Sequence, residues 1–302
     1  MATVDDAREG KAIADILDKY TYKNGRDIVT TWNDWLSWCC KVFEWRDIER
    51  AGGIPQRFIE CKEENPLFFD AMEGWLALAY EKICKRGAYD AFGALYEANY
   101  QSSFKAKSCG QFFTPTSVCD ALARIGGNGK CLEPTEEIVS FNDCACGSGR
   151  TLLSAWNECD KYNRNLFFSG DLDATSVYMC ALNFMVHGMV GAVEKRDALT
   201  REWYFGFIVN ACKVPYANNF ACLQSYDNEE EYKKAVNGLI ANAKVWNCID
   251  YRLKSEQETI REEPQREEEP KAETPIRGAE PIENKQIEQK SVKEPIQLSL
   301  FD

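Results

Sequence analysis

The chain of 302 residues contains a single histidine, His187, and no two of its 14 cysteines form a C-x-x-C pair. Structural zinc sites need Cys or His ligands paired at short spacing, so this pattern argues against a zinc site. We therefore predict no metal ligands, and we interpret the cysteines as free, buried thiols that pack as small apolar side chains.

Long apolar runs and an export signal are also missing. No stretch of about 18 apolar residues occurs, which predicts that no helix spans a membrane. The N-terminus, MATVDDAREGKAI, lacks the basic region and apolar run of a signal peptide. We therefore expect a cytoplasmic protein without a membrane partner, in a reducing compartment that disfavours a disulfide framework.

The chain also lacks an excess of positive charge. The net charge is −12, and residues 255–302, with 13 acids and 7 bases, contribute −6 of it. Affinity for DNA comes largely from neutralising phosphates, so an acidic chain is by itself a poor ligand for DNA. A role on DNA would then depend on a partner subunit with a basic surface.

Three regions follow one another along the chain. In residues 1–104, apolar and aromatic residues recur at helical spacing, which predicts a helical domain whose Trp and Phe side chains form its core. In residues 105–254, short apolar runs alternate with helical stretches, which predicts an α/β domain with a parallel sheet and crossover helices. Residues 255–302 hold five of the ten prolines among charged residues, so we predict a disordered acidic tail.

The sharpest local pattern is D-C-A-C-G-S-G at residues 143–149, which we call the motif loop. It follows a strand-like run and precedes a helical stretch. Glycines there let the backbone approach a ligand closely, and the helix N-terminus offers unpaired N–H groups. Taken alone, the pattern fits an ordinary glycine-rich turn equally well.

Further residues accompany the motif loop in a regular order. Asp171 and Asp197 each end a later strand-like run, and G-Q-F-F-T-P at 110–115 lies before a helical stretch. Ligands of open α/β sheets bind where parallel strands end, and an acid after the second strand can accept hydrogen bonds from ribose hydroxyls. The set predicts a nucleotide-like ligand at that edge of the sheet.

This order of motifs resembles the N6-adenine DNA methylase family, which includes the modification subunits of type I restriction systems. The resemblance implies a Rossmann-like fold that binds S-adenosylmethionine. It implies that Asp171 holds the ribose and Asp197 the adenine. The methionine part would be held by residues of the two motifs: Phe112, Phe113, Thr114, Asp143, Cys146 and Gly147.

The catalytic motif departs from the family. The family has Asn-Pro-Pro followed by an aromatic residue after the fourth strand, where the Asn binds the adenine amino group and the ring stacks on the flipped base. Here Asn210 follows the strand-like run 204–209 without that continuation. Alternatively, Pro215-Tyr216 is the remnant of the motif, and Lys213 then replaces the Asn. The 38 residues from 217 to 254 are too few for three further strands together with a target-recognition region, which predicts a truncated sheet. Two functions stay open: an adenine-specific DNA methyltransferase, or a catalytically silent S-adenosylmethionine-binding scaffold of a DNA-processing or restriction assembly.

The last residues form a separate pattern. Q-L-S-L-F at 297–301 closely resembles the pentapeptide that binds the bacterial sliding clamp. The resemblance implies that Gln297 caps a small pocket while Leu298, Leu300 and Phe301 fill an apolar groove. An apolar cluster at the end of a disordered segment is typical of a short recognition element, so we predict the clamp as a partner.

Overall fold

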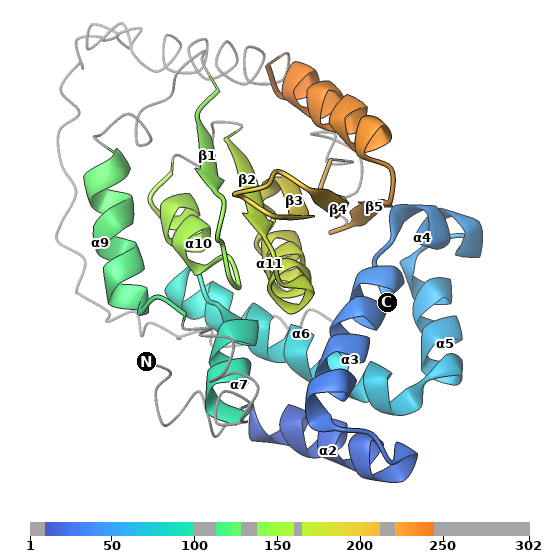
Figure 1. The fold of residues 1–302 in the computed structure, drawn as a ribbon. Coiled ribbons are helices and arrows are strands. Elements are labelled where there is room, and N and C mark those ends of the chain that lie inside the picture. Colours follow the sequence, from blue (N-terminus) through green and yellow to red (C-terminus); the bar gives the residue numbers. More distant parts are fainter. Residues whose placement is uncertain (1–9, 100–112, 128–137, 160–164, 212–220, 245–302) are drawn as a thin grey trace, which may run out of the picture. The chain divides into compact units, whose positions relative to one another are not determined.

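The computed structural model describes residues 10–99, 113–127, 138–159, 165–211 and 221–244 (Figure 1). The domain boundary predicted near residue 104 and the tail predicted from residue 255 lie outside these ranges. Within the described ranges, no helix is both long and apolar enough to cross a membrane. The same ranges contain no group of three or more His, Cys, Asp or Glu side chains that could hold a metal ion.

The first region folds into consecutive α-helices, as its apolar periodicity predicts. Asp27 begins one of them by accepting a hydrogen bond from the Thr30 N–H at 3.0 Å, and Asn65 followed by Pro66 begins another. The helices are α2 (Lys11–Asn24), α3 (Ile28–Val42), α4 (Trp45–Ala51), α5 (Ile54–Glu64), α6 (Pro66–Arg86) and α7 (Ala91–Asn99).

Aromatic side chains form the centre of the helical core. Trp32, Trp35 and Trp75 are almost completely buried, and the ring centroids of Trp75 and Phe92 lie 4.4 Å apart. The prediction that these aromatic residues are core residues is confirmed. The same hydrophobic cluster continues through residues that pack on the sheet, such as Phe184, so the helices and the sheet share one core.

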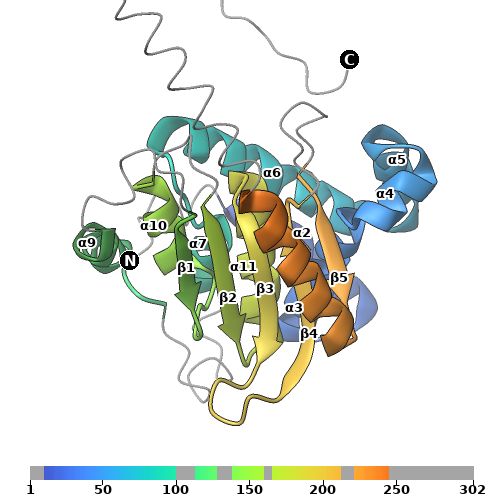
Figure 2. The same ribbon diagram turned by 90° about the horizontal axis from the view of Figure 1, so that it is seen from above.

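Five strands form one sheet in the order β1-β2-β3-β4-β5 (Figure 2). The strands β1 (Ser140–Asp143), β2 (Leu166–Asp171) and β3 (Val190–Arg196) are parallel. They end at one side of the sheet, which we call the carboxyl edge; the opposite side is the amino edge. The strands β4 (Trp203–Val209) and β5 (Leu223–Tyr226) are antiparallel to their neighbours.

The antiparallel β4 corrects the expectation of a parallel sheet. A crossover between parallel strands needs a dozen or more residues, but only residues 197–202 connect β3 to β4. This short link closes as a turn, in which the Asp197 N–H donates to the Glu202 carbonyl at 2.9 Å. The chain is therefore a helix-rich α/β protein with a mixed sheet.

Helices cover both faces of the sheet (Figure 2). One face carries α10 (Arg150–Asn157) and α11 (Ala174–His187), and α9 (Thr116–Gly127) packs against α10. A helix over residues 229–244 covers the other face, where Tyr232 lies so close to Gly206 that a Cβ there would meet its ring at 2.6 Å.

Most described cysteines agree with the expected free thiols. Six are free and buried: Cys39, Cys40, Cys61, Cys119, Cys146 and Cys180. Cys84 and Cys144 are free but exposed. Cys222 is disulfide-bonded, which corrects the expectation at that position.

Candidate functional site

The motif loop connects β1 to α10 at the carboxyl edge. The Gly149 N–H donates to the Cys146 carbonyl at 2.8 Å, and the Cys146 N–H donates to the Gly170 carbonyl of β2 at 3.0 Å. Gly147 has a φ of 54° and Gly149 a φ of 87°, a region that side chains other than glycine enter at a cost. A Cβ at Gly149 would also meet the Cys180 Sγ at 2.8 Å. The loop therefore needs glycine at both positions.

Two of the predicted acids accept hydrogen bonds from the backbone of the motif loop. Asp171 accepts hydrogen bonds from the Gly147 N–H and from the Asp173 N–H, both at 2.9 Å. Its side chain is half-buried, and burial raises the pKa of its carboxyl group. Asp143 accepts from the Ala145 N–H at 3.1 Å. The structure thus brings the ends of β1 and β2 together around the loop.

Asp197 lies at the same edge, where it organises the turn between β3 and β4. One carboxylate oxygen accepts from the Leu199 N–H at 2.8 Å and from the Thr200 N–H at 3.1 Å. These two hydrogen bonds lower the pKa of Asp197. The carboxylate of Asp197 therefore forms hydrogen bonds within the turn that connects β3 to β4.

The upstream motif also contacts the motif loop. The ring of Phe113 lies against Gly147, where a Cβ would be 3.1 Å from it, and the Thr114 carbonyl accepts from the Arg150 Nη1 at 3.1 Å. Phe112 lies outside the described residues. Two segments that are about 30 residues apart in sequence thus meet at one place.

Cys146 is buried among the residues beneath the loop. Its Sγ lies 3.5 Å from the Gly147 carbonyl, and the neighbouring Cys180 together with burial raises its pKa well above the usual range. A thiol in these surroundings stays protonated, so Cys146 contributes packing and not a thiolate nucleophile.

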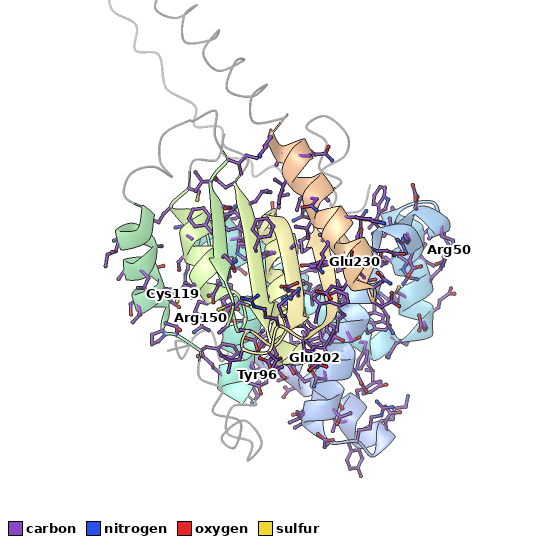
Figure 3. All side chains as sticks on the ribbon, turned by 45° about the horizontal axis from the view of Figure 1, so that its top comes forward. Arg50, Tyr96, Cys119, Arg150, Glu202 and Glu230 are labelled. Atoms are coloured by element: carbon purple, nitrogen blue, oxygen red, sulfur yellow. The ribbon has the colours of Figure 1, made fainter. Side chains whose placement is uncertain are left out.

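Sequence reasoning missed a buried polar cluster beneath the loop. Arg150, which is labelled in Figure 3, is the first residue of α10. It donates from Nε to the Asp90 Oδ2 at 2.9 Å and from Nη2 to the Glu97 Oε2 at 3.2 Å. The two acids raise the pKa of Arg150 above its ordinary value. The only sequence signal was an arginine directly after the last glycine of the loop.

Exposed leucines at the carboxyl edge were also missed. Leu172 follows Asp171 and is 56% exposed, and Leu199 in the turn after Asp197 is 95% exposed. The available signal was a leucine one or two residues after each of the two acids. Both leucines offer apolar surface that a flat ligand at this edge would cover.

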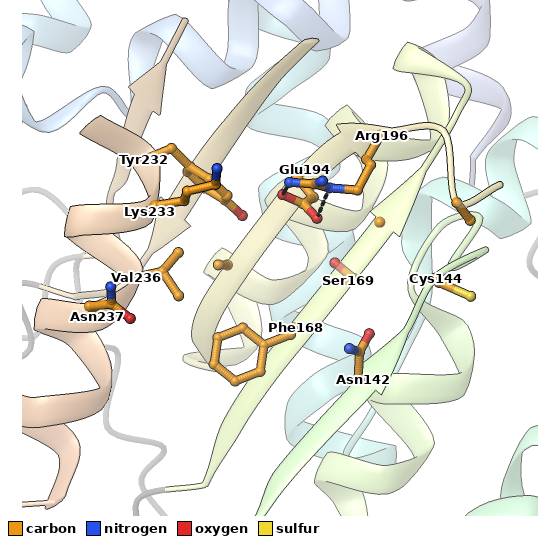
Figure 4. Close-up of a pocket in the computed structure, with 13 residues that line it drawn as sticks. Asn142, Cys144, Phe168, Ser169, Glu194, Arg196, Tyr232, Lys233, Val236 and Asn237 are labelled. Atoms are coloured by element: carbon orange, nitrogen blue, oxygen red, sulfur yellow. Dashed lines mark hydrogen bonds and ion pairs between the residues drawn. The ribbon is translucent and has the colours of Figure 1, made fainter. Parts of the chain in front are cut away.

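A pocket of about 520 Å³ opens between the sheet and the helix over residues 229–244 (Figure 4). Phe168 and Ala192 line its sheet side, and Cys144 of the motif loop lies at its border. Two of its charged groups are paired with each other, because the Arg196 Nε contacts the Glu194 Oε1 at 2.7 Å. The Lys233 Nζ is paired with Glu229 and Glu230 outside the lining. The pocket therefore presents apolar surface and paired charges next to the carboxyl edge.

Asn210, the predicted catalytic asparagine, lies apart from these residues. It follows β4, and because β4 runs antiparallel to β3, it lies at the amino edge. Its side chain is completely buried there. Its Nδ2 donates to three carbonyl oxygens at 2.8–3.3 Å, and its Oδ1 accepts from the Cys222 N–H at 3.2 Å. Both polar atoms of its side chain thus bind the protein backbone. Tyr216 lies outside the described residues.

Comparison with known proteins gives a family match and a relative. The sequence model of the family described as N-6 DNA Methylase matches residues 87–246, which is 160 of the 302 residues. The type I restriction enzyme MpnII methylase subunit of Mycoplasma pneumoniae (strain ATCC 29342 / M129 / Subtype 1) is 30% identical over 154 residues, which cover 45% of this chain and 27% of that protein. The chain thus spans about a quarter of the length of this relative. No solved structure matches the chain.

Proposed function

Because the chain belongs to the N-6 DNA methylase family, we propose that it binds S-adenosylmethionine at the carboxyl edge and serves the N6 methylation of adenine in DNA. One observation carries the proposal. The Gly147 N–H donates to Asp171 at 2.9 Å while the Phe113 ring lies against Gly147, so three separate motifs meet at one point. In this proposal the sheet is a truncated Rossmann-like one, preceded by a helical domain (1–104) and followed by an acidic tail (255–302).

The residues at the carboxyl edge fit this cofactor. Each oxygen of Asp171 accepts one hydrogen bond from the protein, which leaves lone pairs for the two ribose hydroxyls. The exposed Leu172 and Leu199 would cover the adenine ring, with Asp197 beside it. When bound, S-adenosylmethionine supplies an electrophilic methyl group. The methionine part would lie against the two motifs, at Phe112, Phe113, Thr114, Asp143, Cys146 and Gly147.

A second candidate function is a cofactor-binding module that transfers no methyl group by itself. The position of Asn210 favours it, because its amide is completely buried at the amino edge and therefore has no surface open to adenine N6. In this version, Asn210 stabilises the end of α11. Tyr216 or a partner subunit would then contact the target base.

The net charge of the chain and the type of protein to which it is similar are the basis for the partners that we propose. That relative is the methylase subunit of a restriction enzyme, and the net charge of −12 disfavours direct binding to DNA. We therefore propose a cytoplasmic protein that reaches DNA through a partner subunit. Binding of the sliding clamp through Gln297, Leu298, Leu300 and Phe301 would add a second route, because a tethered domain gains local concentration. Loss of clamp binding in a Leu300→Ala, Phe301→Ala variant tests this part.

Calorimetric titration with S-adenosylmethionine tests the cofactor site. We expect binding by the intact chain with a micromolar dissociation constant and its loss in Asp171→Ala. Asp34→Ala removes an acid from α3 in the helical region and serves as the control, with affinity unchanged. Absence of binding by the intact chain would contradict the proposal. Mass spectrometry for N6-methyladenine in DNA incubated with the chain then separates the two candidate functions.

A further inference from the structure

A buried aspartate of the helical region lies directly beneath the motif loop. Asp90, at the start of α7, is only 8% exposed. Its Oδ2 accepts from the Ser148 Oγ at 2.5 Å and from the Arg150 Nε at 2.9 Å. Both donors belong to the loop or to the first residue after it. Asp90 therefore holds the end of the motif loop through two side chains.

The other oxygen of Asp90 holds the same loop by a second path. Oδ1 accepts from the Asn183 Nδ2 of α11 at 2.8 Å, and that Nδ2 also donates to the Ser148 carbonyl at 2.9 Å. The Gly93 N–H donates to Oδ1 as well, at 2.8 Å. The backbone and the side chain of Ser148 are thus both fixed by groups that converge on one carboxylate.

Arg150 extends these contacts to the upstream motif. Its guanidinium lies 5.6 Å from the centre of the Phe113 ring and donates to the Thr114 carbonyl at 3.1 Å. The approach of α7 is close: a Cβ at Gly93 would lie 2.0 Å from the Asp90 Oδ2 and 2.7 Å from the Arg150 Nη2. Only glycine at position 93 permits the carboxylate and the guanidinium to occupy this place.

We propose that Asp90 is a positioning residue for the cofactor site, fixing the motif loop so that its backbone and Phe113 can receive S-adenosylmethionine. The inference rests on the proposed function for its ligand. If Asp90 has this role, the helical region contributes to the cofactor site, because Asp90 and Glu97 belong to helical segments that come before both motifs in the sequence.

Glu44 provides a matched comparison. It is also 8% exposed and also joins the helical region to the sheet, because it accepts from the Ser225 N–H of β5 at 2.9 Å. It lies at the β5 side of the sheet and has no hydrogen bond with the motif loop among the described residues. The changes Asp90→Asn and Glu44→Gln each replace a buried carboxylate by an amide of the same shape.

The experiment combines hydrogen exchange with calorimetry on the full chain. For Asp90→Asn we expect at least tenfold weaker binding of S-adenosylmethionine and faster amide exchange at Cys146, Gly147 and Gly149. For Glu44→Gln we expect affinity within twofold of the original chain and no change at these amides. Ser148→Ala removes a single donor to Asp90; if Asp90→Asn does not fold, it supplies the same two measurements, with an expected loss of affinity of about threefold.

The outcomes separate the inference from the function it rests on. Affinity within twofold and unchanged loop exchange in Asp90→Asn would overturn the positioning role while S-adenosylmethionine binding stands. Equal losses in Asp90→Asn and Glu44→Gln would also overturn it, because Asp90 would then act only through general stability. If the original chain binds no S-adenosylmethionine, the proposed function fails, and selective exchange in the loop would still support the role of Asp90 in fixing it.

Discussion

The two edges of the sheet contain the two groups of residues that the sequence singles out, and they differ in how their polar atoms are used. At the carboxyl edge, Asp171 has free lone pairs and Leu199 is 95% exposed. At the amino edge, Asn210 is fully buried and donates to or accepts from four backbone groups. A residue type that suits catalysis thus serves stability when it is fully buried and its amide hydrogen-bonds to the surrounding backbone.

The strongest test of this difference is Asn210→Ala. The change removes the Nδ2 donor from three carbonyl oxygens and the Oδ1 acceptor from the Cys222 N–H, and it puts alanine at a φ of 56°. Two of these carbonyls, those of Phe184 and Met185, keep a backbone N–H donor. We expect a loss of about 4 kcal/mol in the free energy of unfolding, measured by urea denaturation. Asn210→Gly removes the backbone strain and is expected to lose about 1 kcal/mol less. Wild-type stability in Asn210→Ala would contradict the structural role.

The acid sensitivity of His187 tests the packing of α11, whose end Asn210 holds. Its Nε2 accepts from the Tyr89 N–H at 3.0 Å, and its Nδ1 lies 2.7 Å from the Asn183 carbonyl. Burial lowers its pKa to about 4, against about 6.5 in an unfolded chain. The unfolded chain therefore binds more protons between pH 6.5 and 4, so stability falls by up to about 3 kcal/mol as the pH drops through this window. His187→Gln should show a shallower decline, and an identical decline would contradict the assignment.

Gly149→Ala tests the conformation of the motif loop at the carboxyl edge. A Cβ there has an unfavourable φ and meets the Cys180 Sγ at 2.8 Å, so we expect a loss of about 2 kcal/mol in thermal or urea unfolding. Gly25→Ala is the control because Gly25 has a φ of 61° with nothing within 4 Å of its Cβ. It should lose about 1 kcal/mol from strain alone. Equal losses in the two variants would show that the loop can move away from Cys180.

Leu199→Ser has the smallest expected effect on the fold. The side chain is 95% exposed, so stability should stay within about 0.5 kcal/mol of the original. The affinity for S-adenosylmethionine should fall by about threefold to tenfold, since the change removes apolar cover from the adenine ring. Calorimetry measures the affinity of both the variant and the original chain for S-adenosylmethionine. Unchanged affinity would place the adenine elsewhere, for instance deeper in the pocket beside Phe168.

Local patterns predicted the helices, β1–β3 and the motif loop, because these depend on short-range periodicity and on glycine. The direction of β4 could have been derived from the six residues that precede it, but a strand-like run by itself carries no direction. Asn210 was therefore expected at the carboxyl edge, where the end of a parallel fourth strand would lie. The antiparallel turn at residues 197–202 places it at the other edge.

The contacts of Asp90 could not be predicted in the same way. Asp90 and Ser148 are 58 residues apart, and no spacing rule connects an acid before one helix to a loop before another. Their contact depends on how α7 packs against α11, which the shared aromatic core determines. The need for glycine at position 93 likewise appears only when the packed distances to Asp90 and Arg150 are known.

The most direct measurement compares S-adenosylmethionine binding to Asp171→Ala and to Asn210→Gly, each at a temperature where the variant is folded. The account predicts that Asp171→Ala loses binding and that Asn210→Gly, although less stable, binds as tightly as the original chain. Loss of binding in folded Asn210→Gly with retention in Asp171→Ala would contradict the assignment of the ligand to the carboxyl edge.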